Sequence, residues 1–166
     1  GIDPSDYPGG PLAGIEFQRK LESHAFVMGG SNYDAPAQTV GAFLRGETQE
    51  HVGTVEPSFK PGIKLTNLAD ALPDFCIEAL REAIPAFNKK VRGFAFEDAL
   101  LTGVETRTSA PINITRDKYS LESVNTKGLY PAGEGAGYAG GIMSAAIDGI
   151  KIAEAMALSI NNTMKV

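Results

Sequence analysis

The chain has 166 residues, of which 43% are hydrophobic, and this suits one domain, or two small lobes, with a buried core. Its formal net charge of −5 argues against nucleic acid as a partner, because phosphate binding needs clustered Lys and Arg. No apolar stretch approaches the ~20 residues of a membrane-spanning helix, so we expect no membrane partner.

The first part of the chain is predicted to be helical. Residues 1–10 are polar and rich in Pro and Gly, which indicates an extended lead-in. Pro11 suits the first turn of a helix over residues 11–28, in which apolar side chains recur with helical spacing. Residues 31–37 (SNYDAPA) are predicted to form a loop, and Thr39–Arg45 a short helix that Gly46 closes.

The next segments alternate between irregular and helical patterns. Residues 47–64 are polar and contain two prolines, which indicates an irregular crossing segment. Thr66 is predicted to cap a brief turn directly after it. A helix is predicted to begin at Pro73 and to be broken or kinked at Pro85, with one more turn over residues 86–91.

Beyond residue 98 the pattern changes to β-strands. Residues 99–108 and 111–115 are rich in β-branched side chains and alternate in polarity, so they are predicted strands. Residues 117–125 form a polar loop or a hairpin return. A further strand over residues 127–132 leads into a glycine-dense turn, and a terminal helix follows over residues 141–160.

The terminal helix is predicted to have two faces. Ser144, Asp148, Lys151 and Glu154 or Ala155 mark the solvent side. The opposite face consists of small and apolar residues, namely Ile142, Ala145, Ala146, Gly149, Ala153 and Met156. Such a face lets a helix backbone lie close against a sheet.

The most informative feature is the turn before this helix. Residues 135–140 read G-A-G-Y-A-G, which matches the G-x-G-x-x-G pattern of dinucleotide-binding turns. Glycines allow a ligand to approach the backbone, and the new helix directs its free N–H groups and its positive dipole end toward an anion or carbonyl. The usual fingerprint opens a βαβ unit, whereas this one leads to the last helix of the chain. We therefore interpret it as the last βα element of a larger fold.

Other chemistry has little support. The single cysteine, Cys76, lies among apolar neighbours, and neither His24 nor His51 is near it in sequence, so a packed hydrophobic role is favoured. No metal-binding, P-loop or Ser-His-Asp pattern occurs, and the sequence singles out no catalytic residue. One cysteine without a signal peptide fits a reducing compartment, and we expect a cytoplasmic protein.

Residues 129–149, LYPAGEGAGYAGGIMSAAIDG, resemble the C-terminal flavin-binding segment of the bacterial FAD-dependent dehydrogenases, also described as NAD(FAD)-utilising flavoproteins. The resemblance spans residues 11–157. Further blocks match in the same order: PLAGIEFQRKLE at 11–22, APAQ at 35–38, LPDF and EALREAIPAF at 72–87, RGF at 92–94 and LLTGVETRTSAP at 100–111. Family members are longer and begin with a Rossmann βαβ unit that holds the ADP part of FAD. The resemblance therefore implies that this sequence is the C-terminal portion alone.

The resemblance also implies a cofactor site at the glycine turn. Gly133 and Glu134 would face the ribitol and pyrophosphate of FAD. The first N–H groups of the terminal helix would face the pyrimidine side of the flavin, where the helix dipole stabilises negative charge. The implied cofactor-binding residues are Gly133, Glu134, Gly135, Ala136, Gly137, Gly140, Gly141 and Ile142.

A second implied element is Arg107-Thr108-Ser109, which supplies a cation and two hydroxyls where a predicted strand opens into a loop. Taken alone, these residues suit a turn as well as a ligand-facing edge. The resemblance assigns them to the flavin or substrate side. It leaves the substrate open, with NAD(P)H a candidate electron donor.

These inferences predict an α+β fold with a helix-rich cap lobe, a few strands and a long C-terminal helix. The expected domains are the lead-in 1–10, a helical cap or substrate lobe 11–97, and the C-terminal segment of the FAD-binding domain 98–166. The expected function is FAD-dependent oxidoreduction in the intact parent, with little catalysis by the fragment. The expected partners are a small-molecule substrate, the N-terminal FAD domain of the same parent chain, and further copies of the fragment through exposed strand edges. The alternatives are a non-enzymatic helical module that binds a ligand or partner, with a structural glycine turn, and a phosphate-binding domain that uses the helix N-terminus.

Overall fold

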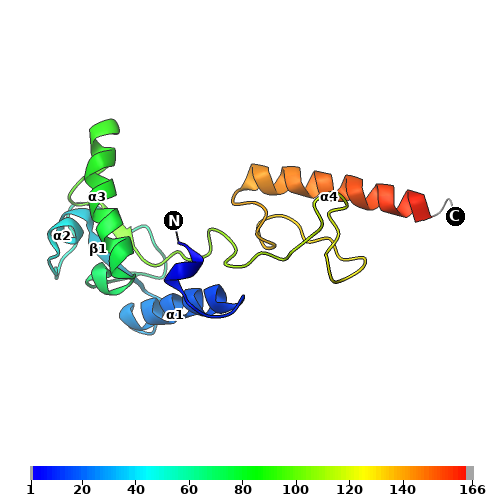
Figure 1. The fold of residues 1–166 in the computed structure, drawn as a ribbon. Helices are drawn as coiled ribbons and strands as arrows, with labels where there is room; N and C mark the ends of the chain where they lie inside the picture. Colours follow the sequence, from blue (N-terminus) through cyan, green and yellow to red (C-terminus); the bar gives the residue numbers. More distant parts are fainter. Residues whose placement is uncertain (1, 164–166) are drawn as a thin grey trace. The chain divides into compact units, whose positions relative to one another are not determined.

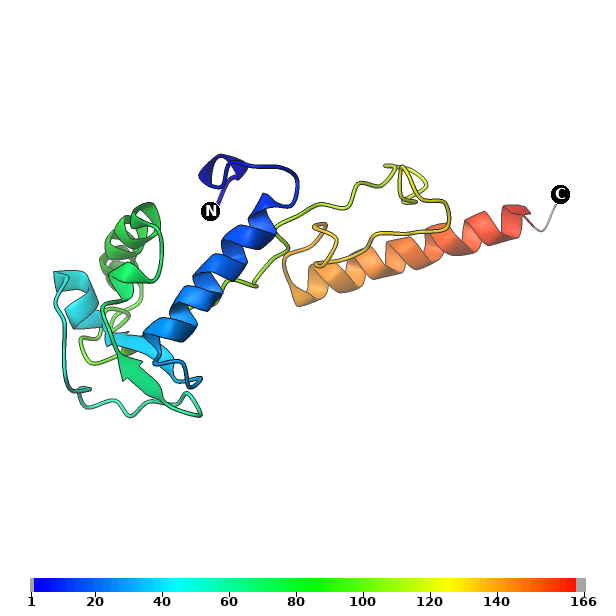
Figure 2. The same ribbon diagram turned by 90° about the horizontal axis from the view of Figure 1, so that it is seen from below.

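The computed structural model describes residues 2–163 and has the predicted mixed α+β architecture (Figures 1 and 2). Long helices alternate with short strands and with extended loops. The described elements are η1 (Pro4–Asp6), α1 (Ala13–Met28), β1 (Ala35–Thr39), α2 (Val40–Arg45), β2 (Ile63–Leu65), η2 (Leu68–Asp70), α3 (Asp74–Lys90), β3 (Leu100–Thr102) and α4 (Ile142–Thr163).

The chain divides into two compact units. Unit 1 comprises residues 1–18 and 106–166, and unit 2 comprises residues 19–105. The predicted domains, 1–10, 11–97 and 98–166, stay predictions, and their outer ends at residue 1 and residues 164–166 lie outside the described residues.

Unit 2 is built on a three-stranded sheet in the order β2-β1-β3. The central strand β1 runs parallel to β2 and antiparallel to β3, and all five of its residues are buried. The prediction of a loop over residues 31–37 was therefore wrong for its last three residues. Proline is uncommon in a central strand because it cannot donate to a ladder. Pro36 is tolerated here because pairing with β3 begins one residue later, at Ala37 opposite Thr102.

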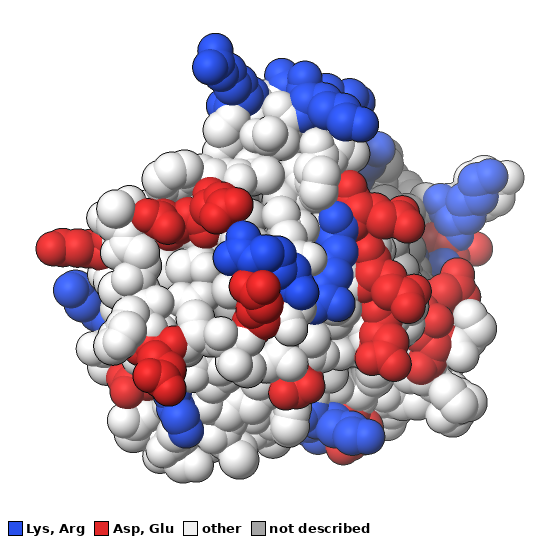
Figure 3. Space-filling model, turned by 90° about the vertical axis from the view of Figure 1, so that its left-hand side faces the viewer, with Lys and Arg blue, Asp and Glu red and all other residues white. Residues whose placement is uncertain are grey.

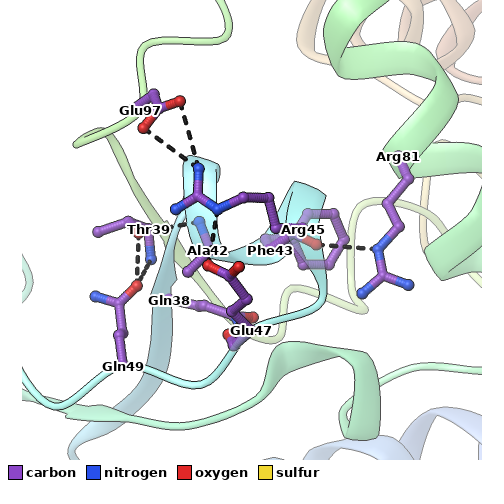
Figure 4. Close-up of polar contacts among 9 residues, drawn as sticks. All are labelled: Gln38, Thr39, Ala42, Phe43, Arg45, Glu47, Gln49, Arg81 and Glu97. Carbon is purple, nitrogen blue, oxygen red and sulfur yellow. Dashed lines mark hydrogen bonds and ion pairs between the residues drawn. The ribbon is translucent and has the colours of Figure 1, made fainter.

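The short helix α2 follows β1 directly and has the predicted ends. Thr39 is its N-cap, with the Oγ1 atom accepting from the Ala42 N–H at 3.4 Å, and Gly46 ends it in the left-handed region at φ 70°. Figure 4 shows the polar contacts around this helix, in which Gln49 Oε1 accepts hydrogen bonds from the backbone N–H and the hydroxyl of Thr39. These contacts fix the corner between β1 and α2.

The core of unit 2 lies where α2, η2 and α3 meet. Phe43 is 1% exposed and is the largest fully buried side chain of the described residues. Arg81 of α3 donates from Nε to the Phe43 carbonyl oxygen at 3.0 Å, and its guanidinium carbon lies 5.2 Å from the centre of the Phe43 ring (Figure 4). The remaining buried members of this cluster are Val40, Leu68, Ala71, Ile77 and Ile84.

Two further predictions in this region need correction. α3 is continuous from Asp74 to Lys90 with Pro85 inside it, so a break at this proline was wrong, and the alternative, a kink, stays a prediction. Its buried residues Ile77 and Ile84 both precede Pro85 and anchor that part of the helix to the core. The turn at η2 is capped by Asn67, whose side chain accepts from the Ala69 N–H at 3.2 Å, and not by Thr66.

The predicted strands of the second half are mostly absent from the described residues. β3 covers only Leu100–Thr102, and residues 111–115 and 127–132 are loops that hydrogen-bond to other segments without forming a ladder. For example, the Ile114 N–H donates to the Ala136 carbonyl oxygen at 3.1 Å. β-Branched side chains form strands only where neighbouring strands complete a ladder.

The charged side chains of the face in Figure 3 are of both signs. Figure 3 shows Lys and Arg gathered at the upper end of this face and interspersed with Asp and Glu below it. None of the described helices combines the length and the hydrophobicity that crossing a bilayer requires.

Candidate functional site

The glycine turn of unit 1 is held in shape by its own backbone. Gly133 and Gly137 have φ values of +66° and +81°, which side-chain-bearing residues rarely adopt. The Tyr138 N–H donates to the Gly133 carbonyl oxygen at 2.9 Å, and the Gly137 N–H donates to that of Glu134 at 2.9 Å. The two bonds make residues 133–138 a closed loop directly before α4.

One side of this loop packs against residues 112–114. A Cβ on Gly137 would overlap the carbonyl oxygen of Ile112, and Asn113 donates to the Gly137 carbonyl oxygen at 3.1 Å. Ala136 is buried, and its carbonyl oxygen accepts from Ile114. The second glycine of the G-x-G-x-x-G pattern is therefore required by the approach of another backbone segment. The predicted cofactor contacts of Ala136 and Gly137 stay predictions.

The other side of the turn is open. A Cβ on Gly135 or Gly140 would meet no atom of the described chain within 4 Å, and one on Gly141 would meet only the Ser144 hydroxyl at 3.8 Å. Ile142, the first residue of α4, is 91% exposed. The first four N–H groups of any α-helix lack partners within the helix, and those of α4 directly follow Gly140 and Gly141 in the chain.

The remaining predicted site residues lie on exposed or half-buried loops. Glu134 is half-buried within the turn. Arg107, Thr108 and Ser109 are exposed and follow β3 by several residues, so the strand that was predicted to carry them ends earlier. Near them, Gln18 of α1 donates to the Thr106 carbonyl oxygen at 2.5 Å and lies 3.5 Å from that of Ser109.

A buried ion pair lies behind the turn. Arg116 donates from Nη2 to Asp148 Oδ1 at 2.6 Å and from Nη1 to Asp148 Oδ2 at 2.9 Å, and the two side chains are 10% and 11% exposed. The hydrogen bond from Arg116, together with one from the Gly133 N–H, lowers the pKa of Asp148 to about 2. The same hydrogen bond raises the pKa of the Arg116 guanidinium.

Arg116 also contacts the turn itself. Its Nη1 donates to the Pro131 carbonyl oxygen at 2.7 Å, and its Cζ lies 3.6 Å from the centre of the Tyr138 ring. The Tyr138 hydroxyl accepts from the Arg116 backbone N–H at 3.1 Å and donates to the Ile114 carbonyl oxygen at 3.1 Å. Arg116 thus contacts both Pro131, which precedes the turn, and Tyr138, which ends it.

Sequence reasoning missed this pair. Asp148 was placed on the solvent side of the terminal helix, and that placement was wrong because its side chain is buried against Arg116. One signal was available: Asp148 is the only charged residue in the apolar stretch 142–150. An isolated carboxylate in such surroundings requires a cationic partner.

α4 exposes a broad apolar surface in the described structure. Its buried side carries Asp148 and Ile152, whereas the small-residue face predicted to pack on a sheet is mostly exposed. The exposed large apolar residues of α4 are Ile142, Met143, Ile147, Ile150, Met156, Leu158 and Ile160. A helix that is apolar around most of its circumference is normally buried.

Comparison with known proteins adds two findings. A family model described as FAD-dependent protein, C-terminal domain-like, matches residues 1–108. An uncharacterised protein of Clostridium beijerinckii is 54% identical over 154 residues, which is 92% of this chain and 29% of that protein. Because the match covers 92% of this chain, a continuous match includes the glycine turn whichever terminal residues it leaves out. The chain thus spans less than a third of the length of this relative.

Proposed function

The chain belongs to the FAD-dependent protein, C-terminal domain-like family, and from this premise we propose that it completes the flavin site of an FAD-dependent oxidoreductase. In this proposal residues 98–166 supply the last part of the FAD-binding domain, and residues 11–97 cap the substrate pocket. The observation that carries the proposal is the glycine turn, which is rigidly bonded on one side and open on the other.

The open side fits a flat, polar cofactor. Because no Cβ projects at Gly135 or Gly140, a ligand can approach the backbone there without displacing a side chain. Gly133 and Glu134 would hold the ribitol and pyrophosphate, and the N–H groups of Gly140, Gly141 and Ile142 would hold the pyrimidine edge. FAD, when bound, supplies the hydride-accepting ring.

The role of the chain's own residues would be electrostatic and steric. The N-terminus of α4 has a partial positive charge, and it would stabilise negative charge on the pyrimidine edge of a reduced flavin. Ile142 and Met143, which are 91% and 72% exposed, would exclude water from one side of that edge. NAD(P)H is the electron donor to be assayed first.

The exposed surface of α4 supports a second part of the proposal. We expect it to be covered in the intact protein by the N-terminal FAD domain of the same parent chain. The Clostridium beijerinckii protein is long enough to hold such a domain, since this chain matches 29% of it. The small residues Ala146, Gly149 and Ala153 would let α4 lie close to the sheet of that domain.

The experiment measures flavin in the full-length protein. We expect the wild-type protein to purify yellow with about one FAD per chain, and Gly140→Val to lose most of it. Gly10→Val is the matched control, because Gly10 is equally open but lies in the lead-in. A colourless wild-type protein that leaves the fluorescence of added FAD unchanged would refute the proposal.

A non-enzymatic module with a structural glycine turn is the second candidate. The contact of Gly137 with the Ile112 carbonyl oxygen favours it, because this glycine is needed by the chain itself. Under this candidate Gly140→Val and Gly10→Val behave alike, with equal flavin content and equal thermal stability. The same pair of variants therefore separates the two functions.

A further inference from the structure

The Arg116–Asp148 pair joins the glycine turn to α4 through buried side-chain hydrogen bonds. The Asp148 carboxylate accepts two hydrogen bonds from Arg116 and one from the Gly133 N–H, the last at 2.8 Å. We propose that Arg116 and Asp148 are positioning residues that hold the turn and the N-terminus of α4 in the arrangement that meets the cofactor. This inference rests on the proposed function.

The contacts of the pair reach three separate parts of the site. Arg116 binds the Pro131 carbonyl oxygen at the entry to the turn and stacks on Tyr138 near its end. Asp148 belongs to α4 and accepts a hydrogen bond from the N–H of Gly133, the first residue of the turn. A shift of either side chain therefore changes the angle between the turn and the helix whose N–H groups face the open side.

Apolar packing cannot hold the turn in place of this pair. In the described part of residues 106–163, the buried apolar side chains are those of Pro131, Ala136 and Ile152. None of them is large enough to form an extensive core. The bidentate pair and the stacked Tyr138 ring have fixed geometry, since a guanidinium offers its donors in one plane. These contacts therefore fix the position of the turn more precisely than the packing of the three buried apolar side chains does.

Burial makes the pair sensitive to the loss of one member. A buried charge without its partner is strongly unfavourable, whereas replacing both members with apolar residues of similar volume is often nearly neutral for folding. The double variant Arg116→Met/Asp148→Leu thus separates folding from positioning. It restores packing, but it leaves Pro131 and Gly133 without their partners.

The experiment compares variants of the full-length protein. We expect Asp148→Asn to raise the FAD dissociation constant by about tenfold or more and to change the visible circular dichroism of bound flavin. The double variant should unfold at a higher temperature than Asp148→Asn, because it leaves no unpaired buried charge, and still show the weaker affinity and altered spectrum. Arg116→Lys should retain only part of the wild-type affinity for FAD, because a lysine ammonium cannot donate two parallel hydrogen bonds to the Asp148 carboxylate. Glu154→Gln, an exposed site on the same helix, is the control.

A second readout does not depend on FAD. In this chain alone, Asp148→Asn should speed hydrogen exchange at the Gly133 N–H and shift the amide resonances of Gly140 and Gly141. Variants that bind FAD like the wild type with an unchanged flavin spectrum overturn the inference, and so do unmoved Gly140 and Gly141 resonances. A wild-type protein that binds no FAD overturns the proposed function instead, and the amide data then decide the positioning role.

Discussion

Acidification should release the glycine turn through Asp148. The pKa of this carboxylate is lowered from 3.8 to about 2, chiefly by the Arg116 hydrogen bond. Each pKa unit corresponds to ~1.4 kcal/mol, so the folded state favours the ionised over the protonated form of Asp148 by about 2 kcal/mol relative to the unfolded chain. The side chain is 11% exposed, and solvent screening removes little of this amount.

The sign of the effect follows from the direction of the shift. Because the folded-state pKa of Asp148 lies below its ordinary value, the stabilisation is complete above pH 3.8 and is lost as the pH falls through about 2. The exposed carboxylate of Asp117 also has a lowered pKa, because it accepts hydrogen bonds from Ser120 and Tyr119. Its contribution to stability is therefore also lost as the pH falls. Wild type and Asp148→Asn must therefore be compared at each pH.

The assay combines a carboxyl-carbon NMR titration of Asp148 with urea unfolding followed by circular dichroism. We expect a titration midpoint near 2, and a difference in unfolding free energy between wild type and Asp148→Asn that shrinks by about 2 kcal/mol between neutral pH and the midpoint. Glu154→Gln should follow the wild-type curve. A midpoint near 3.8, or a difference that does not change with pH, would show that Arg116 does not stabilise the Asp148 carboxylate.

Substitutions at three further sites and one association measurement have defined outcomes. Phe43→Ala removes a side chain that is 1% exposed and should cost ~3–5 kcal/mol in urea unfolding; a loss below ~1 kcal/mol would contradict the placement of the core. Thr39→Ala removes the cap of α2 and should cost ~1 kcal/mol, whereas Thr39→Ser should restore most of it. Gly137→Ala should destabilise unit 1 by at least ~1 kcal/mol because of its positive φ and the contact with Ile112, while Gly140→Ala should not. The exposed apolar side of α4 should cause self-association, seen as a rising sedimentation coefficient with concentration; a strictly monomeric chain would contradict this.

Local patterns in the sequence predicted several elements well. The short helix α2 followed from Thr39 and Gly46 because capping preferences act within one turn. α4 was expected over residues 141–160 and spans Ile142–Thr163, since its small and apolar residues have high helical propensity and no proline interrupts them. The glycine turn before α4 was located from the spacing of its glycines, which is also a local pattern.

Features that depend on distant residues could not be predicted. β1 is a buried central strand only because β2 and β3 pair with its two halves, and Pro36 concealed this in the sequence. The Arg116–Asp148 pair joins residues 32 positions apart, and helical periodicity alone placed Asp148 on the wrong side. Residues 111–115 have the side chains of a strand, but no neighbouring ladder exists for them among the described residues. The exposed edges expected there are absent, so the prediction of self-association now rests on α4.

The most direct test of the central claim follows the amide resonances of Gly140, Gly141 and Ile142 in the full-length protein as FAD is added. We expect these three resonances to shift in step with flavin binding, and to shift again when the bound flavin is reduced and gains negative charge beside the N-terminus of α4. Full binding of FAD with all three resonances unmoved would show that the flavin is held elsewhere, and would contradict the account.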